Sequence, residues 1–552
     1  MSESPSDLHD RFSQSLRSMY PSPPTAASEH FAALASQVLA QPSTPLSSTS
    51  SSADSDISLI RCQCLLILGL FECTEGAENK GWLRIGTAIR MAQVLRLGFE
   101  DEETGSRGRT DPLQAEIRRR TFWSCFLLDR TVTDGKERPC SLRPPHASTL
   151  RMPGPDADFL LSRYSPGACF EAGLPPWNIS AKLDPSRASN DQEADLFGQT
   201  LRVAEIWHRV VSYVGAGGRN WDRRAPWDPD SSFAKLEKEI TEWQAGLQAI
   251  FRYNGEGLGR LRDANLVAHS MIGQGRLFGM LHLLCACSNL ILHRDYLPFL
   301  PGSDFKAENG PIDGEPLYGD LAAFAPPDWW EDSLSIAFDS AGVISDLCTS
   351  LSQHGSQITH PFAGFAALAA GTLHSHLKYW PKSCRKPINS SYYFDQDLAI
   401  LGSLKGVYPI ASIWCDGISR LDLLYSNLVR GVIDVDPSQV RSSVIKLLRT
   451  ARDDDTTSPA RSTNGRHSNN STGISPDATP VLPVSMGGST MSLFAPANPY
   501  TLDALPSPMG GLDSDYSLDS MAADEAFWGT WTDFSLFGLD TSGNGGVVPA
   551  WQ

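Results

Sequence analysis

Apolar residues recur at intervals of three or four positions from Ile57 to about Arg452, which is the period of an α-helix. Asp111-Pro112 is a typical helix start, because aspartate accepts from free N–H groups and proline lacks the unused donor. Alternating strand patterns bounded by turn pairs are missing, so the predicted class is all-α. Helices are predicted over Ile57–Cys73, Asn79–Leu97, Asp111–Thr131, Leu201–Val214, Phe233–Phe251, Val267–Leu292, Leu334–Leu351, Gly364–Leu377, Leu398–Val429 (as one helix or two) and Pro437–Ala451.

The two ends of the chain have a different pattern. Residues 1–55 finish in a Ser/Thr/Pro run, and only Phe31–Leu39 has the pattern of a short helix. Such a composition buries too little apolar surface to offset the entropy of ordering the backbone. We therefore expect a disordered Ser/Pro-rich segment over 1–55, a multi-helical domain over 56–452, and a disordered acidic-aromatic tail over 453–552.

Charge is concentrated in that tail. The 552 residues carry a net charge of −17, and residues 453–552 hold 12 acidic against two basic side chains, which is −10 of the total. This balance argues against a uniformly basic nucleic-acid-coating protein. No uncharged apolar run approaches the ~18 residues of a membrane span, and the first ten residues are acidic, unlike a secretory signal. Eleven scattered cysteines suit a reducing compartment, so we expect a soluble intracellular protein without a membrane partner.

Residues with metal-binding or catalytic chemistry do not form a known pattern. No two cysteines are three residues apart, and Cys62/Cys64 and Cys285/Cys287 lie in apolar helical stretches, so buried structural thiols are expected. His374-Ser-His376 has a spacing that favours surface or hydrogen-bonded core histidines. Phosphate-binding loops and a Gly-x-Ser-x-Gly elbow are also missing. The prediction is no catalytic residue, no metal site, no cofactor in this chain, and no enzymatic activity.

The segment from Glu116 to Leu142 combines charge and aromatic residues in an unusual density. The three arginines at 118–120 fan over roughly 200° of a helix, so they cannot all face one phosphate backbone, and ion pairs within the protein are favoured. The Phe-Trp pair that follows supplies apolar contacts, Asp-Arg supplies further ion pairs, and Arg-Pro begins an ordered loop. The motif residues are Arg118, Arg119, Arg120, Phe122, Trp123, Asp129, Arg130, Arg138 and Pro139.

As a block, Glu116-Ile-Arg-Arg-Arg-Thr-Phe-Trp, then Asp129-Arg130, then Arg138-Pro-Cys-Ser-Leu resembles the middle homology region of fungal zinc-cluster (Zn2Cys6) transcription factors. Glu137 stands where that family usually has glycine. Gly81-Trp-Leu-Arg and Leu290-Ile-Leu-His-Arg also resemble family segments, and the resemblance covers about 57–429. It implies a helical regulatory domain of a nuclear regulator of RNA polymerase II genes, and no catalysis.

The resemblance also implies partners. The family's six-cysteine cluster binds two zinc ions, but its Cys-x-x-Cys pairs are absent from this chain, so DNA contact requires an upstream cluster or a partner. A small-molecule effector and a homodimer or heterodimer are further expectations from the family. The alternatives are a protein-interaction regulator without DNA contact, such as a partner or inhibitor of a full-length relative, and an α-helical enzyme or small-molecule carrier.

The tail predicts a contact with a coactivator. Aspartates and glutamates are interspersed with aromatic and aliphatic residues, which is typical of disordered activation segments whose charges keep the aromatics solvated. A helix formed on binding would gather most of the aromatics on one side. The residues predicted to make this contact are Phe527, Trp528, Trp531, Phe534 and Phe537.

Overall fold

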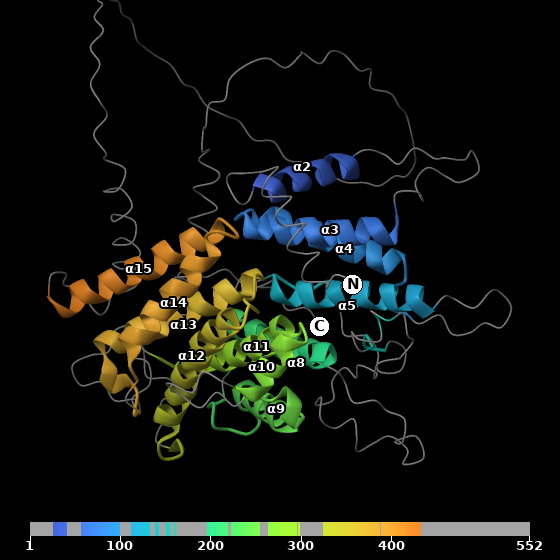
Figure 1. The fold of residues 1–552 in the computed structure, drawn as a ribbon. Helices are drawn as coiled ribbons and strands as arrows, with labels where there is room; N and C mark the ends of the chain where they lie inside the picture. Colours follow the sequence, from blue (N-terminus) through green and yellow to red (C-terminus); the bar gives the residue numbers. More distant parts are fainter. Residues whose placement is uncertain are drawn as a thin grey trace, which may run out of the picture.

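The protein is described from a computed structural model (Figure 1). Its described residues are 26–40, 57–99, 112–132, 138–142, 151–154, 159, 161, 196–218, 222, 224–253, 263–294, 296–297, 324–386 and 388–431. They form α-helices and short 3-10 helices, with no β-strand in these ranges, which confirms the all-α class. The α-helices are α2 (Ala26–Ala40), α3 (Leu59–Thr74), α4 (Glu78–Val94), α5 (Pro112–Thr131), α8 (Leu196–Gly215), α9 (Ser232–Gly246), α10 (Ala264–Met271), α11 (Gly275–Arg294), α12 (Trp329–Gln353), α13 (Pro361–Tyr379), α14 (Ser390–Leu404) and α15 (Ile410–Val429).

Most predicted helices are present with shifted ends, but two of them are divided. The stretch Phe233–Phe251 forms α9 and a short 3-10 helix, Ala249–Phe251. The stretch Val267–Leu292 was expected as a single helix and forms α10 and α11 instead. Gly273 lies between them with φ of 79°, a left-handed conformation that ends a helix and suits glycine. The stretch Leu398–Val429 lies across two helices, α14 and α15.

The short helix predicted over Phe31–Leu39 is present as α2, which begins earlier, at Ala26, so the disorder expected over 1–55 does not hold for Ala26–Ala40. The Arg61 guanidinium donates to the carbonyl of Leu39 at 2.8 Å, and the Leu39 side chain packs against the core that contains α3 and α4. The apolar pattern of α2 is weak, so this helix is stabilised mainly by its packing against the rest of the fold. The helix predicted over Pro437–Ala451 and the whole tail over 453–552 lie outside the described residues.

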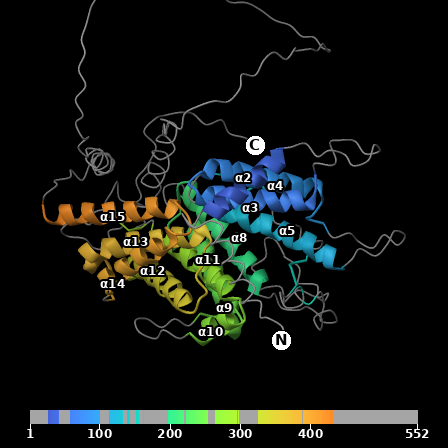
Figure 2. The same cartoon turned by 45° about the horizontal axis from the view of Figure 1, so that its top comes forward.

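The helices build three adjoining hydrophobic cores (Figures 1 and 2). The first lies among α3, α4 and α5, the largest surrounds α11, and the third lies among α13, α14 and α15. Helix α8 belongs to two of them, because Leu201 packs in the first core and Trp207 in the largest. This helix therefore joins the N-terminal layer to the rest of the molecule.

Helices α11 and α12 form the interior of the largest core. Both are long and apolar enough to cross a bilayer by length and composition, but 78% and 61% of their apolar windows are buried inside the fold. A helix that is apolar on all sides is stable in water only when other helices surround it. Both are core helices here.

The hairpin of α3 and α4 is packed unusually closely through two glycines. A Cβ added at Gly81 would lie 2.5 Å from the carbonyl oxygen of Gly69 and 2.6 Å from the Cys73 sulfur. Only glycine lets the two backbones approach this far, which explains the glycine that precedes Trp82 in the sequence.

Candidate functional site

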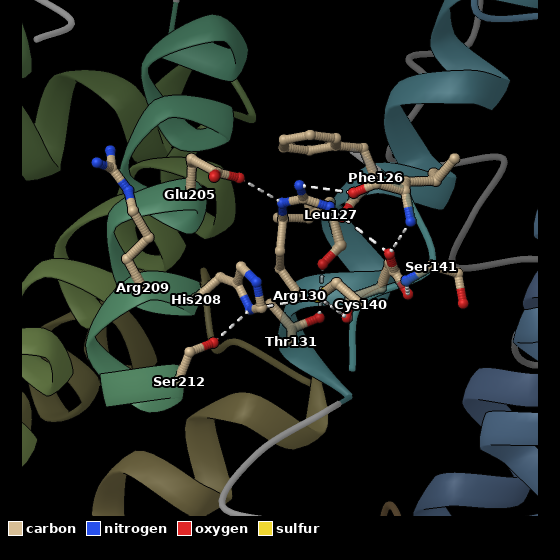
Figure 3. Close-up of polar contacts among 12 residues, drawn as sticks. Phe126, Leu127, Arg130, Thr131, Cys140, Ser141, Glu205, His208, Arg209 and Ser212 are labelled. Atoms are coloured by element: carbon tan, nitrogen blue, oxygen red, sulfur yellow. Dashed lines mark hydrogen bonds and ion pairs between the residues drawn. The ribbon is translucent and has the colours of Figure 1, made fainter. Parts of the chain in front are cut away.

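The charged motif lies where α5, the loop 138–142 and α8 meet, and Arg130 is at its centre (Figure 3). The Arg130 Nε donates to Glu205 of α8 at 2.8 Å, and Nη2 donates to the Leu142 carbonyl at 3.1 Å. The guanidinium also lies 3.3 Å from the centroid of the Phe126 ring. Only 1% of Arg130 is exposed, so this cation is almost fully desolvated and is compensated by an opposite charge, a carbonyl and a π face.

Asp129 holds the loop that follows α5. Its carboxylate accepts from the backbone N–H of Ser141 at 3.1 Å and of Leu142 at 2.8 Å. Burial raises the pKa of Asp129, while these two hydrogen bonds and Arg130 act against that shift. Asp129, Arg130, Glu205 and the loop 138–142 are called the α5–α8 joint below.

A cysteine and a histidine meet at the edge of the joint (Figure 3). The Cys140 sulfur lies 3.2 Å from Nδ1 of His208 and 3.2 Å from the Asp129 carbonyl oxygen. Burial first, and the Arg130 cation second, lower the pKa of His208. The imidazole is therefore neutral at physiological pH and serves as a hydrogen-bonding partner of the loop.

One turn into α5, Glu116 is the acidic partner of two of the three arginines. Arg119 pairs with it, and Arg120 Nε donates to it at 2.9 Å. The same carboxylate accepts from the Gly154 N–H at 3.0 Å, and Arg120 Nη2 donates back to the Gly154 carbonyl at 2.7 Å. The arrangement ties the segment 151–154 to the first half of α5.

The other two arginines of the motif reach α4. Arg118 donates to the Leu95 carbonyl at 2.9 Å, past the C-terminal end of that helix. Arg138 bonds to Asn79 at its first turn and lies 5.3 Å from the Trp82 ring centroid. Pro139, beside it, is exposed.

The aromatic pair of the motif fills the core of the N-terminal layer. Trp123 is 0% exposed, and its ring packs edge-on against Phe122 and Phe126 at centroid distances of 5.5 and 5.1 Å. Its Nε1 donates to the Arg151 carbonyl at 2.8 Å. The tryptophan thus has both the apolar contact and the hydrogen bond that a buried indole requires.

The structure therefore brings Asp129, Arg130 and the Arg-Pro loop together, whereas Arg118 reaches past α4 and the other two consecutive arginines share Glu116. The contacts described engage each motif arginine with a carboxylate, a carbonyl or a side-chain amide. Such an arrangement fixes the positions of the helices relative to one another. The sequence pattern alone does not reveal Glu205 and His208, because nothing marks these positions of α8 as facing Arg130 and Cys140, which lie 75 and 68 residues earlier in the chain.

Among the described residues, no group of three or more histidines, cysteines or acidic side chains is close enough to hold a metal ion. Cys62, Cys285 and Cys287 are buried in helix cores, as expected for structural thiols, whereas Cys64 is only half-buried. The described residues thus do not fit a two-zinc cysteine cluster.

A second buried polar group, which we call the His374 cluster, consists of Ser345, His374 and Asp397. Nδ1 of His374 lies 2.7 Å from Oδ2 of Asp397, and Ser345 Oγ donates to Oδ1 at 2.5 Å. All three side chains are 0% exposed, and the contacts join α12, α13 and α14. The neighbouring His376 is likewise 0% exposed, with its Nε2 3.3 Å from Ser383 Oγ, so both histidines of the His-Ser-His sequence are core residues.

Residues 8–245, which include α5, α8 and the joint between them, match the family model described as the fungal specific transcription factor domain. The chain contains a fungal specific transcription factor domain. This is a domain of transcription factors and not of an enzyme family.

Curated relatives agree with this transcription factor domain. An uncharacterized transcriptional regulatory protein of Schizosaccharomyces pombe is 28% identical over 338 residues, which is 59% of this chain and 46% of the relative. The Zn(2)-C6 fungal-type transcription factor FTF2 of Fusarium oxysporum f. sp. lycopersici is 26% identical over 317 residues, 56% of this chain and 27% of the relative. The chain thus spans less than half the length of these relatives. No solved structure matches.

Within the transcription factor domain, the motif residues form the contacts among α4, α5 and α8. The five aromatic residues proposed for activation, from Phe527 to Phe537, lie outside the described residues. The domain supports a transcriptional regulator at the level of the family.

Proposed function

We propose that this chain regulates the transcription of RNA polymerase II genes in the nucleus. The observation that carries the proposal is the match of residues 8–245 to a transcription factor domain, within which the charged motif of this chain forms the α5–α8 joint. In this proposal the helical body is the regulatory part, and a coactivator is contacted by the acidic tail.

The composition of the tail supports its proposed role in contacting a coactivator. Residues 513–540 carry acidic side chains beside the five aromatics from Phe527 to Phe537, and no lysine or arginine follows Arg466. The acidic charges favour a partner groove with a basic rim, and the aromatics supply the apolar contact.

A reporter assay tests the activation half of the proposal. The segment Ala526–Leu539, fused to an unrelated DNA-binding domain, is expected to raise reporter expression above that of the DNA-binding domain alone. A version with all five aromatics changed to alanine retains the acidic charge and is expected to return to background. Equal signals from the two fusions would mean that the tail only increases solubility.

The leading proposal and its alternative differ in whether the regulator contacts DNA. The motif arginines are engaged inside the fold, so this motif offers no free cation to a phosphate backbone. We propose that DNA contact comes from a zinc cluster outside these 552 residues or from a dimer partner. The alternative is a regulator that acts on other proteins without DNA contact.

A gel-shift titration of the purified 552-residue chain on random duplex DNA at rising salt tests whether these residues themselves contact DNA. We expect no binding at physiological salt. Binding that weakens steeply with salt would show a cationic DNA-contact surface within the chain and contradict this placement.

A further inference from the structure

A cavity of about 220 Å³ opens between α12, α13 and α14. Its floor is formed by buried residues from three elements, and its rim by partly exposed residues with hydroxyl and amide groups. The lining residues are Cys348, Thr349, Ser352, Gln353, Gln357, Ile358, Ala363, Gln396, Ala399, Ile400, Ser403 and Leu404.

The lining of the cavity is mainly apolar, with a few hydroxyl and amide groups, and it carries no formal charge, since it contains no lysine, arginine, aspartate or glutamate among these described residues. The thiol at its floor is neutral as well, because burial raises the pKa of Cys348 to about 12. An ion that entered would lose its hydration without gaining a counter-charge. The cavity therefore suits an uncharged molecule, and the protonated thiol makes covalent capture unfavourable.

Gln396 places an unused hydrogen-bond acceptor at the cavity. Its Nε2 donates to the Tyr392 hydroxyl at 2.5 Å. Its Oε1 is buried and has no hydrogen-bond partner within the described part of the chain. A buried amide oxygen without a partner is unfavourable, so a donor that reaches it gains a hydrogen bond.

From the lining, the neutral floor and the unused acceptor, we infer that this cavity binds a small uncharged molecule that donates a hydrogen bond to Gln396. A cavity of about 150 Å³ holds benzene. The volume here therefore accommodates one six-membered ring with a small polar substituent.

The cavity also lies at a contact between elements. The Gln357 side chain, in the connection between α12 and α13, donates to Ser403 of α14 at 2.7 Å. Gln396 directly precedes Asp397, which the His374 cluster binds to α12 and α13. A bound molecule would touch both sides of this contact and stabilise the packing of α14.

Ligand-observed NMR on the purified full chain tests the inference with four probes of similar shape. Benzamide and phenol are uncharged and carry a donor, toluene lacks the donor, and benzoate is charged. We expect saturation transfer to benzamide and phenol, and little or none to toluene and benzoate. Failure of both donor-bearing probes to bind, or equal binding of benzoate, would overturn the inference.

Three variants on α14 locate the binding. Gln396→Leu removes the acceptor at similar size and should weaken benzamide binding about three- to tenfold, the equivalent of one neutral hydrogen bond. Ala399→Trp fills the cavity from an exposed position and should abolish binding. Ser391→Trp is the matched control, because Ser391 is exposed on the same helix and does not line the cavity.

Circular dichroism and the thermal midpoint establish that each variant is folded before binding is compared. Benzamide binding that persists in folded Ala399→Trp would place the probe elsewhere and refute the assignment. Because the readout is binding to the chain, this result is independent of the reporter assay and of the proposed function.

Discussion

The α5–α8 joint and the His374 cluster both bury ionisable side chains between helices, but they satisfy them in different ways. In the joint, the permanent cation of Arg130 has the Glu205 carboxylate at 2.8 Å and a backbone carbonyl at 3.1 Å. In the His374 cluster, a carboxylate is shared between an imidazole and a hydroxyl. Burial raises the pKa of Asp397, and contacts with His374 and Ser345 oppose that shift.

The difference teaches which of the two regions depends on charge. Arginine cannot release its proton, so Arg130 requires an opposite charge wherever it is buried. Histidine and aspartate can share or lose a proton, so the His374 cluster can remain hydrogen-bonded without a net charge on either partner. Four predictions test this contrast, beginning with the apolar core that supports the joint.

Trp123→Ala should destabilise the helical body by about 3–5 kcal/mol, because it empties a fully buried aromatic site and leaves the Arg151 carbonyl without its donor. Urea denaturation monitored by circular dichroism measures the change. The matched control is Leu83→Ala on α4, where 64% of the side chain is exposed and the effect should stay within about 0.5 kcal/mol. Similar midpoints for the two variants would contradict the structural role of Trp123.

Charge removal compares the two polar regions directly. Glu205→Gln should cost about 2–3 kcal/mol, because Arg130 then remains buried without its nearest carboxylate. Asp397→Asn should cost about 1 kcal/mol, since an amide can still accept from Ser345 and donate to a neutral His374. If the second substitution costs as much as the first, the contrast between the regions is wrong.

Acid should weaken the core around α11 and α13 through its buried histidines. Burial lowers the pKa of His293 and of His376 to about 3, so the folded state binds no proton where the unfolded state does. Each neutral imidazole contributes fully to the free energy of unfolding above pH 6.5, and this contribution is lost as pH falls toward 3. At pH 5.5 the free energy of unfolding should therefore be lower by about 1.4 kcal/mol for each of the two histidines.

The measurement is the free energy of unfolding at pH 7.5 and pH 5.5. The free energy of unfolding should differ less between pH 7.5 and pH 5.5 in His376→Gln than in the wild type. The reduction should be about 1.4 kcal/mol, because glutamine does not titrate. An identical difference in the variant and the wild type would show that His376 is not held neutral by burial.

The smallest effect is expected at the rim of the joint. Arg138→Ala removes a partly exposed cation that bonds to Asn79 and lies over the Trp82 ring, and it should cost about 0.5–1 kcal/mol. The cost of this substitution should become smaller in high salt, because dissolved ions screen exposed charges. A cost equal to that of Glu205→Gln would mean that the loop and the buried arginine contribute alike.

The sequence by itself determined the helical class, the positions of most helices and the residues of the α5 motif. These features can be predicted from the sequence because apolar periodicity and capping depend on neighbouring residues. The ion pairs of Glu116 with Arg119 and Arg120 are also local, since the three residues lie within about one turn of α5. The burial of Trp123 also follows from its place in the largely apolar stretch 122–128 of α5.

Only the tertiary structure decided how distant residues pair. Glu205 meets Arg130 across 75 residues, and Ser345 meets Asp397 across 52, because helix packing sets which faces touch. The helix α2 and the division of α10 from α11 likewise depend on a docking surface and on the left-handed Gly273. The cavity beside Gln396 arises from three helices at once, so no local pattern in the chain marks it.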